Sequence, residues 1–498
     1  MFGSNGWRAL ALSLALAPTA LAADICKTLK AGGVEIQSPL SLSYTKELRN
    51  YWSAACGDLK PNCIAAPSSA AEMAQIIKNL HNADTLFAVK SGGHMPNNGF
   101  ASIQDGLLIS TQNLDQIDYN PKDHTAVIGP GLTWEDAQKG LAGTGRTIVG
   151  GRMGGVGVGG YMLGGGMSFL STQYGWAANN IVDFEVVLAN GTIVHATETQ
   201  HPDLFMSLKG GGNNFGIVTA YTMQTHPQDH KVWGGNYIFT SDKAPQLLEA
   251  VRTFTDEYPD DKAAIILTAE RGLVLDLWIM FLFYDGPEPP AGVFDEFTAI
   301  PHTSTTKTWD TYYDLLKHND FFILQGQRYV IATETTPLPN KTIGAAPLQE
   351  YYDHFLDVSK SVFGVTGALG SIAFQPMPKT YSQKAKARGG DLLSIPDDQP
   401  YIILELDFSY AFAIDDSKID AATVKMYQGM DNLIQKNIDK GILPDVYRPL
   451  FMNDAYHRQD YWGRIHPDSK ALALKTRKAY DPEGFFQKRT SGGWRLKD

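Results

Sequence analysis

Short apolar runs alternate with turn residues and helical patterns between about residues 60 and 230. Five runs with strand-like alternation or continuous apolar character predict β-strands at 86–90, 106–110, 125–128, 182–188 and 193–196. Asn190-Gly191 separates the last two runs, and this dipeptide favours the tight turn of a β-hairpin. Helices are predicted at 69–82 and 133–141; the first begins at Ser68 or Ser69 with Glu72 in capping position.

The pattern changes near residue 231, where longer strand-like runs and amphipathic helices appear. Strands are predicted at 264–268, 274–284 and 401–410, and helices near 243–257, 347–363 and 417–440. This mixture predicts an α+β fold with an antiparallel sheet. A chain of 498 residues is too long for one ordinary domain. We therefore predict a first domain over 23–230, a second, α+β domain over 231–440, and a closing segment over 441–498.

The N-terminus has the pattern of a cleaved secretory signal. Arg8 precedes an apolar run from Ala9 to Ala17, and Ala20-Leu21-Ala22 gives a small-x-small cleavage pattern. A membrane anchor is the alternative, but the run is shorter than the ~20 residues that a bilayer crossing needs. The sequence thus predicts a signal peptide over 1–22 and a secreted, soluble product with no membrane association.

Composition narrows the possible partners and covalent features. A formal charge of −11 without a basic cluster argues against a nucleic-acid partner. Secretion permits a disulfide, and three cysteines allow one bridge and one free thiol; we favour Cys26–Cys63, while Cys56–Cys63 remains possible. Asn190 and Asn340 begin glycosylation sequons. No metal site is predicted, because His457 and His466 lack a third ligand at suitable spacing.

Glycines crowd into a few runs, of which residues 150–166 (GGRMGGVGVGGYMLGGG) form the longest. This run contains a formal GxGxxG, but three further glycines would disfavour the helix that a Rossmann site requires, at about 1 kcal/mol each. We therefore expect no such helix, and no ribose contact from Asp183. Glycine instead lets backbone N–H groups approach an extended ligand closely. Further pieces at 91–93, 129–131 and 210–216 predict one large, flat ligand contacted by several loops.

These pieces, in this order, resemble the berberine-bridge-enzyme-like FAD-linked oxidases of the vanillyl-alcohol-oxidase superfamily, which have a PCMH-type FAD-binding fold. Lys90-Ser91-Gly92-Gly93-His94 matches the motif whose histidine bonds the flavin, and residues 481–486 (DPEGFF) match the C-terminal signature. The resemblance implies covalent FAD on His94 alone, because Met153 occupies the position of a second, cysteine link. The implied FAD-contacting residues are Ser91, Gly92, Gly93, His94, Gly99, Gly129, Gly131, Gly154, Gly155, Val156, Gly159, Gly160, Gly164, Gly165, Ile217, Val218 and Asn453.

The catalytic residues depart from the family pattern. Sugar- and alcohol-oxidising members carry Y-x-N-Y near the end, whereas this chain has Phe451-Met452-Asn453-Asp454, which argues against a carbohydrate oxidase. Asp454 and Tyr456 are the first candidates for the base that takes a substrate proton. Glu405 and Asp407, on one face of a predicted strand, are further candidates for this base, although a solvated strand face would show the same pattern. Gln325, Gln327 and Tyr329 are also predicted to be same-face strand residues and are candidates for lining the site.

The leading hypothesis is an oxidase in which a small specialised metabolite reduces FAD and molecular oxygen reoxidises it, yielding hydrogen peroxide. Val156 resembles the small residue that oxygen-reactive members carry near the flavin. A second hypothesis retains the fold but makes ring formation the outcome. A third is a flavin-binding protein without turnover, motivated by the missing tyrosines. We expect the protein to be a monomer.

Overall fold

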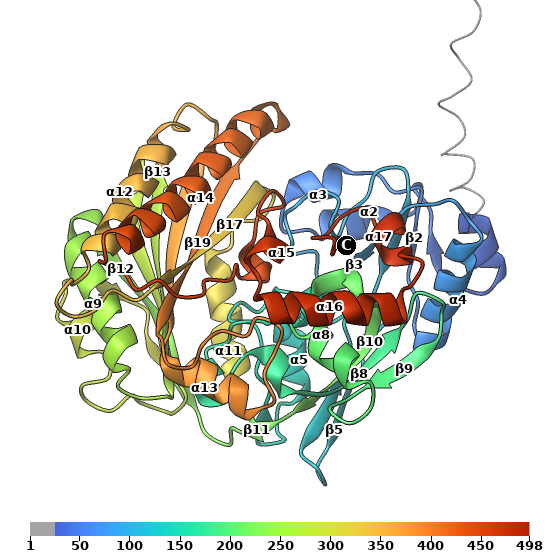
Figure 1. The fold of residues 1–498 in the computed structure, drawn as a ribbon, viewed down its shortest axis with the longest axis horizontal. Coiled ribbons are helices and arrows are strands. Elements are labelled where there is room, and N and C mark those ends of the chain that lie inside the picture. The colour runs from blue at the N-terminus through green and yellow to red at the C-terminus, as the bar shows by residue number, and fades with distance from the viewer. Residues whose placement is uncertain (1–24, 498) are drawn as a thin grey trace, which may run out of the picture.

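Residues 25–497, the part of the chain that the computed structural model describes, form two halves that lie side by side (Figure 1). The half drawn mainly in blue and green contains a four-stranded and a five-stranded sheet, and the other contains an eight-stranded sheet. The predicted α+β class with antiparallel sheets is confirmed. The boundaries at 230 and 440 remain predictions.

The four-stranded sheet positions the loop that contains His94. Its order is β1 (Ile36–Gln37), β2 (Cys63–Ala65), β4 (Leu107–Ser110) and β3 (Phe87–Lys90). Strands β2, β4 and β3 run parallel, and helix α4 (Ala70–His81) connects β2 to β3. The capping prediction is confirmed, because Ser69 Oγ accepts the Glu72 N–H and Glu72 Oε2 accepts the Ser68 N–H. Residues 91–94 leave this sheet directly after β3.

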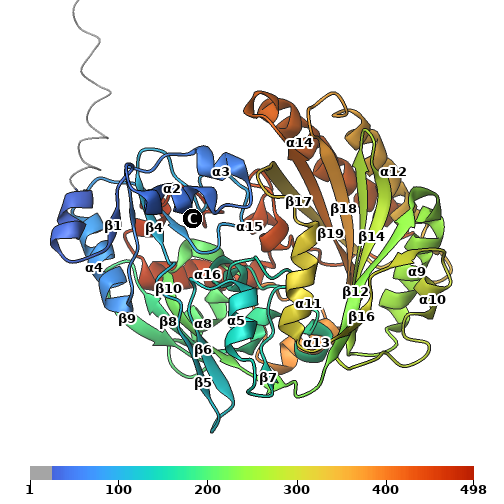
Figure 2. The ribbon, with the colours of Figure 1, turned by 180° about the vertical axis from the view of Figure 1, so that it is seen from behind.

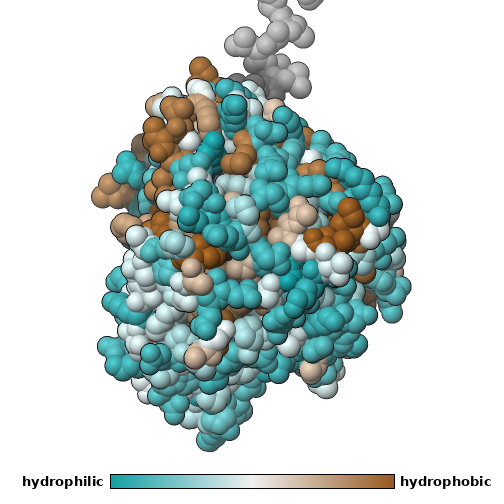
Figure 3. Space-filling view, turned by 90° about the vertical axis from the view of Figure 1, so that its left-hand side faces the viewer, coloured by the Kyte–Doolittle hydropathy of each residue, from teal (hydrophilic) through white to brown (hydrophobic). Residues whose placement is uncertain are grey.

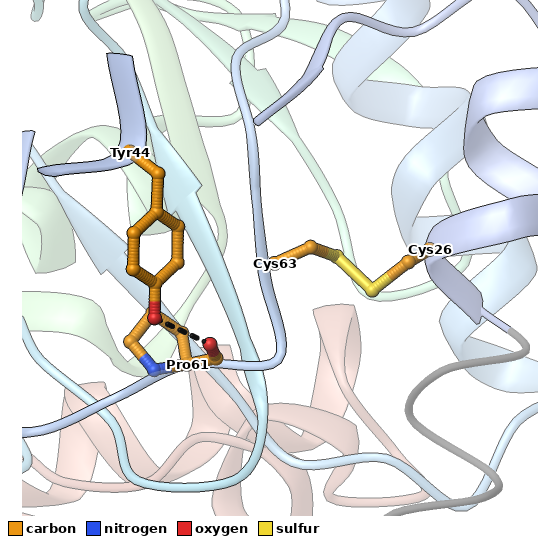
Figure 4. The surroundings of a disulfide bond; sticks show 4 residues. All are labelled: Cys26, Tyr44, Pro61 and Cys63. Carbon is orange, nitrogen blue, oxygen red and sulfur yellow. Dashed lines mark hydrogen bonds between the residues drawn. A yellow bond between two sulfur atoms is a disulfide. The ribbon is translucent and has the colours of Figure 1, made fainter. Parts of the chain in front are cut away.

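A disulfide joins Cys26 to Cys63 at the start of β2, which decides between the two predicted pairings (Figure 4). Cys26 lies in a helical segment over residues 25–31. Nearby, the Tyr44 hydroxyl donates to the Pro61 carbonyl oxygen at 2.7 Å. Cys56 is buried and remains a free thiol. The predicted signal peptide, 1–22, lies outside the described residues, among which no helix has the length and hydropathy needed to span a membrane.

The five-stranded sheet is antiparallel throughout. Its order is β5 (Ile117–Asn120), β6 (Thr125–Ile128), β10 (Ile217–Gln224), β8 (Ile181–Val187) and β9 (Ile193–Ala196). Strands β8 and β9 form the predicted hairpin, and Gly191 adopts a φ of +75° in its turn. Helix α5 (Trp134–Gly140) confirms the second predicted helix, and Thr133 caps it.

One prediction about the glycine run is wrong, because Val158–Leu163 forms a short helix, α6. Val158 and Met162 are fully buried, so packing offsets the poor helix propensity of the glycines. The Rossmann interpretation still fails. Asp183 lies on antiparallel β8, where its Oδ2 pairs with His195 Nδ1 at 2.8 Å.

Three long helices cover one face of the eight-stranded sheet. Its main path runs β15 (Thr303–Ser304), β12 (Val232–Thr240), β14 (Asp276–Tyr284), β13 (Ala263–Gly272), β18 (Leu369–Met377), β19 (Tyr401–Tyr410) and β17 (Arg328–Pro337), with β16 (Lys307–Trp309) also paired to β12. Helices α9 (Ala244–Glu257), α12 (Ala346–Lys360) and α14 (Asp416–Asp439) pack on the covered face (Figure 1). On β19, Leu404 and Leu406 join that core, so Glu405 and Asp407 occupy the opposite face.

The last part of the chain returns to the first half. Helix α16 (Pro467–Tyr480) packs on α8 (Pro202–Leu208), and α17 (Phe485–Arg489) lies beside the 3-10 turn η2 (Gly212–Asn214). Seen from behind, α11 (Tyr312–Asn319) lies between α5 and the eight-stranded sheet (Figure 2). The two halves therefore share packed elements along their boundary.

Candidate functional site

The face of the eight-stranded sheet opposite α9, α12 and α14 and the glycine-rich loops of the first half enclose a cavity of about 680 Å³. Most of the predicted ligand-contacting residues line this cavity. They are Ser91, Gly92, Gly93, His94, Val156, Gly159, Gly160, Gly164, Ile217, Val218 and Asn453. The expectation that loops distant in the sequence surround one large ligand site agrees with this arrangement.

Ser91 holds three of these loops together. Its hydroxyl accepts the Gly159 N–H at 3.1 Å and donates to the Pro130 carbonyl oxygen. Gly92 and Gly157 are in backbone contact, since a Cβ on Gly157 would lie 2.3 Å from the Gly92 nitrogen. Absence of side chains at both positions therefore lets the histidine loop pack directly on the long glycine run.

His94 lies at the cavity wall with its ring stacked on Trp52, at a centroid separation of 4.6 Å. Trp52 in turn stacks on Tyr329, 4.3 Å away, so the imidazole is held in one orientation. Burial lowers the pKa of His94 to about 4. The ring is therefore neutral near pH 7 and keeps one nitrogen lone pair available for bonding. The sequence contained no signal for the role of Trp52, which precedes the glycine motif by about 40 residues.

Six predicted ligand contacts do not line the cavity. At Gly129 and Gly131, a Cβ would collide with the carbonyl oxygens of Leu114 and Thr111, so these glycines allow tight loop packing instead. The Gly155 N–H donates to Asp320 Oδ1 at 3.1 Å, outside the cavity lining. The remaining three are Gly99, which accepts the Ser491 hydroxyl, Gly154, which packs on Asp320, and Gly165, which packs on Leu393.

Four carboxyl groups gather on the sheet side of the cavity. Glu405, Asp407 and Asp454 were predicted, and Glu270 joins them from β13. Glu270 and Asp407 flank Ser371 in one cross-strand row, because β18 pairs with β13 on one side and β19 on the other. Burial and mutual repulsion raise the pKa of Asp407 and Asp454 well above the usual range and that of Glu270 to about 7.

Arg152 and Gln375 provide polar contacts to Asp454 of this cluster. Arg152 Nη2 donates to Gln375 Oε1, and Gln375 Nε2 donates to Asp454 Oδ2 at 3.0 Å. The positive charge of Arg152 lowers the pKa of Glu405 and Asp454, but burial outweighs it. Sequence reasoning missed both residues, although an arginine inside a glycine run was a visible signal for Arg152. Among residues 25–497, no group of three or more His, Cys, Asp or Glu side chains is arranged to hold a metal ion.

Three other candidates lie outside the cavity lining. Tyr456 lies in the helix-covered core, where its hydroxyl donates to Asp420 Oδ1 of α14. Gln325 and Gln327 precede β17, so the prediction that they are same-face strand residues with Tyr329 is wrong. Tyr329 is the member of that set that lines the cavity.

Comparison with known proteins supports FAD as the ligand of the glycine-rich site. A family model described as an FAD binding domain matches residues 61–197. An uncharacterized FAD-linked oxidoreductase of Arthroderma benhamiae is 47% identical over 473 residues, which cover 95% of this chain and 94% of the relative. The chain belongs to this family of FAD-linked oxidoreductases.

A second relative and a solved structure extend the comparison. The bifunctional solanapyrone synthase of Alternaria solani is 30% identical over 460 residues, which cover 89% of this chain and 83% of that enzyme. The structure of berberine bridge enzyme from Eschscholzia californica superposes with a TM-score of 0.75 at 17% identity, covering 95% of this chain and all of that chain, and so shares the fold.

The cavity of this oxidoreductase fits FAD. Gly160 lines the wall, and no heavy atom other than its chain neighbours and the backbone of its own helix lies within 4 Å of where its Cβ would stand, so a flat ligand can approach the backbone there. Asn453 Oδ1 and Trp494 Nε1 are buried at the cavity without a protein hydrogen-bond partner among the described residues. Buried polar atoms of this kind require a polar ligand or water. Ser91, His94, Gly160 and Asn453 would therefore hold the cofactor.

Proposed function

We propose that this FAD-dependent oxidoreductase is a secreted oxidase that binds FAD covalently through His94 and dehydrogenates a small organic substrate. Bound FAD would accept two electrons from the substrate and pass them to molecular oxygen, with hydrogen peroxide as the product. The neutral, oriented imidazole of His94 in a glycine-lined cavity is the observation that carries this proposal.

A single attachment is favoured by the residue at position 153. Met153 lines the cavity where two-link members carry cysteine, and a thioether cannot form the bond that a thiolate forms. A covalent bond would also prevent loss of the cofactor after secretion. The exposed sequon residues Asn190 and Asn340, together with the disulfide, support the secretory route.

We assign the transfer of the substrate proton to the carboxyl cluster, with Asp454 as the base. Asp454 follows Asn453 at the position of the family's last tyrosine, and Gln375 orients its carboxyl group. Its raised pKa makes it a stronger base than an exposed aspartate once deprotonated. Only the carboxylate can accept a proton, so the rate at which the substrate reduces the flavin should increase as pH rises through this elevated pKa.

The attachment to His94 has a direct test. Denatured, acid-precipitated wild-type protein should retain yellow, fluorescent flavin, and His94→Ala should retain none. His124→Ala, on a surface turn outside the cavity lining, is the matched control and should keep its flavin. Release of intact FAD from the denatured wild type would contradict covalent attachment.

The fate of oxygen separates the oxidase from other outcomes. A peroxide-coupled screen of metabolites should give steady hydrogen peroxide with a suitable substrate, which would also exclude a binding protein without turnover. Oxidative ring formation is the second candidate, and one relative is named as a bifunctional synthase rather than an oxidase. A cyclised product without peroxide would support that candidate instead.

A further inference from the structure

Exposed apolar side chains concentrate at one end of the eight-stranded sheet. Of the twelve large apolar side chains that are exposed among residues 25–497, seven belong to loops at this end. We call them the apolar rim: Leu273, Val274, Leu275, Phe321, Leu324, Phe412 and Ile414. Figure 3 shows several large hydrophobic residues exposed toward the upper left of one face of the molecule. Scattered single exposed residues are ordinary, whereas a cluster of this size marks a contact surface.

Strand pairing brings these loops together. Gly272, Leu369, Ser409 and Tyr329 form one cross-strand row at the end of β13, β18, β19 and β17. The turn over 273–275 follows Gly272, and Phe412 follows the end of β19. The loops of the apolar rim therefore emerge from neighbouring strand ends.

The apolar rim is continuous with the cavity. Leu275, Phe321 and Leu324 line the cavity although each is at least 36% exposed. The row of Glu270, Ser371 and Asp407 lies two residues further along the same strands, and two strand residues span roughly 7 Å. Moving outward from the carboxyl cluster, the wall thus changes from charged to apolar within a short distance.

The segment with Phe321 and Leu324 is held in place. Asp320 accepts the Gly155 N–H, and the Tyr329 hydroxyl donates to the Leu324 carbonyl oxygen at 2.8 Å. Phe322 packs edge-on against Phe281 at a centroid separation of 5.5 Å. The exposed ring of Phe321 therefore extends from an anchored segment at the cavity entrance.

We propose that the substrate has an extended apolar part, a hydrocarbon chain or fused-ring skeleton, that binds along the apolar rim. Its group to be oxidised then lies near the carboxyl cluster; the inference rests on the proposed function of this cavity. An oligosaccharide would place its hydroxyl groups against these apolar side chains, where the hydroxyl groups would lack hydrogen-bond partners. This would make its binding free energy less favourable. An apolar skeleton gains affinity by removing the same surface from water.

Linear alcohols from 1-hexanol to 1-decanol test this proposal as probes. We expect calorimetric titration of the flavin-loaded protein to show a dissociation constant that falls about fourfold per added methylene. The double variant F321S/L324S should weaken 1-decanol binding about tenfold and flatten the chain-length dependence. The control L40S/L42S removes two still more exposed apolar side chains from outside the cavity lining and should leave binding unchanged.

Three results would overturn the inference. The first is an unchanged chain-length dependence in F321S/L324S, and the second is the same loss of binding in L40S/L42S. The third is a wild-type dimer in sedimentation that F321S/L324S dissociates, since the apolar rim would then be an interface between copies. Flavin retained after denaturation is measured on the same samples. Its absence would count against the proposed oxidase, while the alcohol series would still report on the apolar rim.

Discussion

The glycines around the cavity serve different purposes, and neighbouring atoms distinguish them. Gly157 contacts the backbone of Gly92, so a methyl group has no space there. Gly160 is three residues away on α6, and no heavy atom beyond its chain neighbours and its own helix backbone lies within 4 Å of the position of a Cβ. Both residues line the cavity, yet packing explains one glycine and ligand access explains the other.

This difference predicts opposite results for two alanine variants. Gly157→Ala should lower the free energy of unfolding by about 1–3 kcal/mol, because its methyl group would force apart the two loops. Gly160→Ala should leave stability unchanged or raise it by up to about 1 kcal/mol, because alanine favours helix. It should nevertheless reduce the flavin content, because the methyl group would occupy ligand space. Urea unfolding and bound flavin per chain measure the two effects; equal loss of stability in both variants would contradict this account.

At the scale of strands, register creates the carboxyl cluster. Period-two alternation places Glu405 and Asp407 on one face of β19, which the sequence predicts. Glu270 becomes their neighbour only because β13 and β19 both pair with β18. Its Oε2 accepts the Ser371 hydroxyl at 2.7 Å, but burial and the charge of Glu405 still raise the pKa to about 7.

The raised pKa of Glu270 predicts a pH-dependent stability. The folded state binds the proton more tightly than the unfolded chain, so this stabilisation is complete below about pH 4.5 and is lost as pH rises through 7. The loss is at most about 3 kcal/mol, because one pKa unit corresponds to about 1.4 kcal/mol. Glu270→Gln should therefore reduce the decline in Tm between pH 5 and 8. Glu288→Gln, in an exposed loop, should retain the wild-type decline; identical profiles for all three proteins would count against this assignment.

At the scale of the whole molecule, short sequence patterns predicted the helices and strands well, but they did not predict contacts between segments that are distant in the sequence. The observed strand Tyr401–Tyr410 has the predicted limits, and Ser69 and Thr133 cap helices as expected, because those signals lie within a few residues. The resemblance supplied His94 and the cofactor. Trp52 and Glu270 reach the cavity, and Gln375 reaches Asp454, through contacts between distant segments. Helix α6 forms through burial of Val158 and Met162, which propensity alone does not show.

The hydrophobic core that surrounds the glycine run continues into the eight-stranded sheet. It includes Trp134 and Phe169 of the first half together with Phe283 and Ile403 of the second. Phe169 stacks on Phe283 at 5.3 Å, with ring planes 9° apart. Disruption of one half therefore exposes apolar surface of the other, which favours unfolding of both as one unit.

We expect one urea transition in which loss of helical circular dichroism coincides with exposure of the flavin. Phe169→Ala should lower the free energy of unfolding by about 3–5 kcal/mol, the usual cost of removing a buried aromatic ring. The urea midpoints from circular dichroism and from flavin exposure should decrease together, because the removed ring contacts both halves. Phe374→Ala, in the core beneath the helices, is the matched control. If the coupling is complete, it should lower the urea midpoint reported by circular dichroism and the midpoint reported by flavin exposure by the same amount. Separate transitions in wild type, or a shift confined to one probe in either variant, would show that the halves unfold independently despite their shared core.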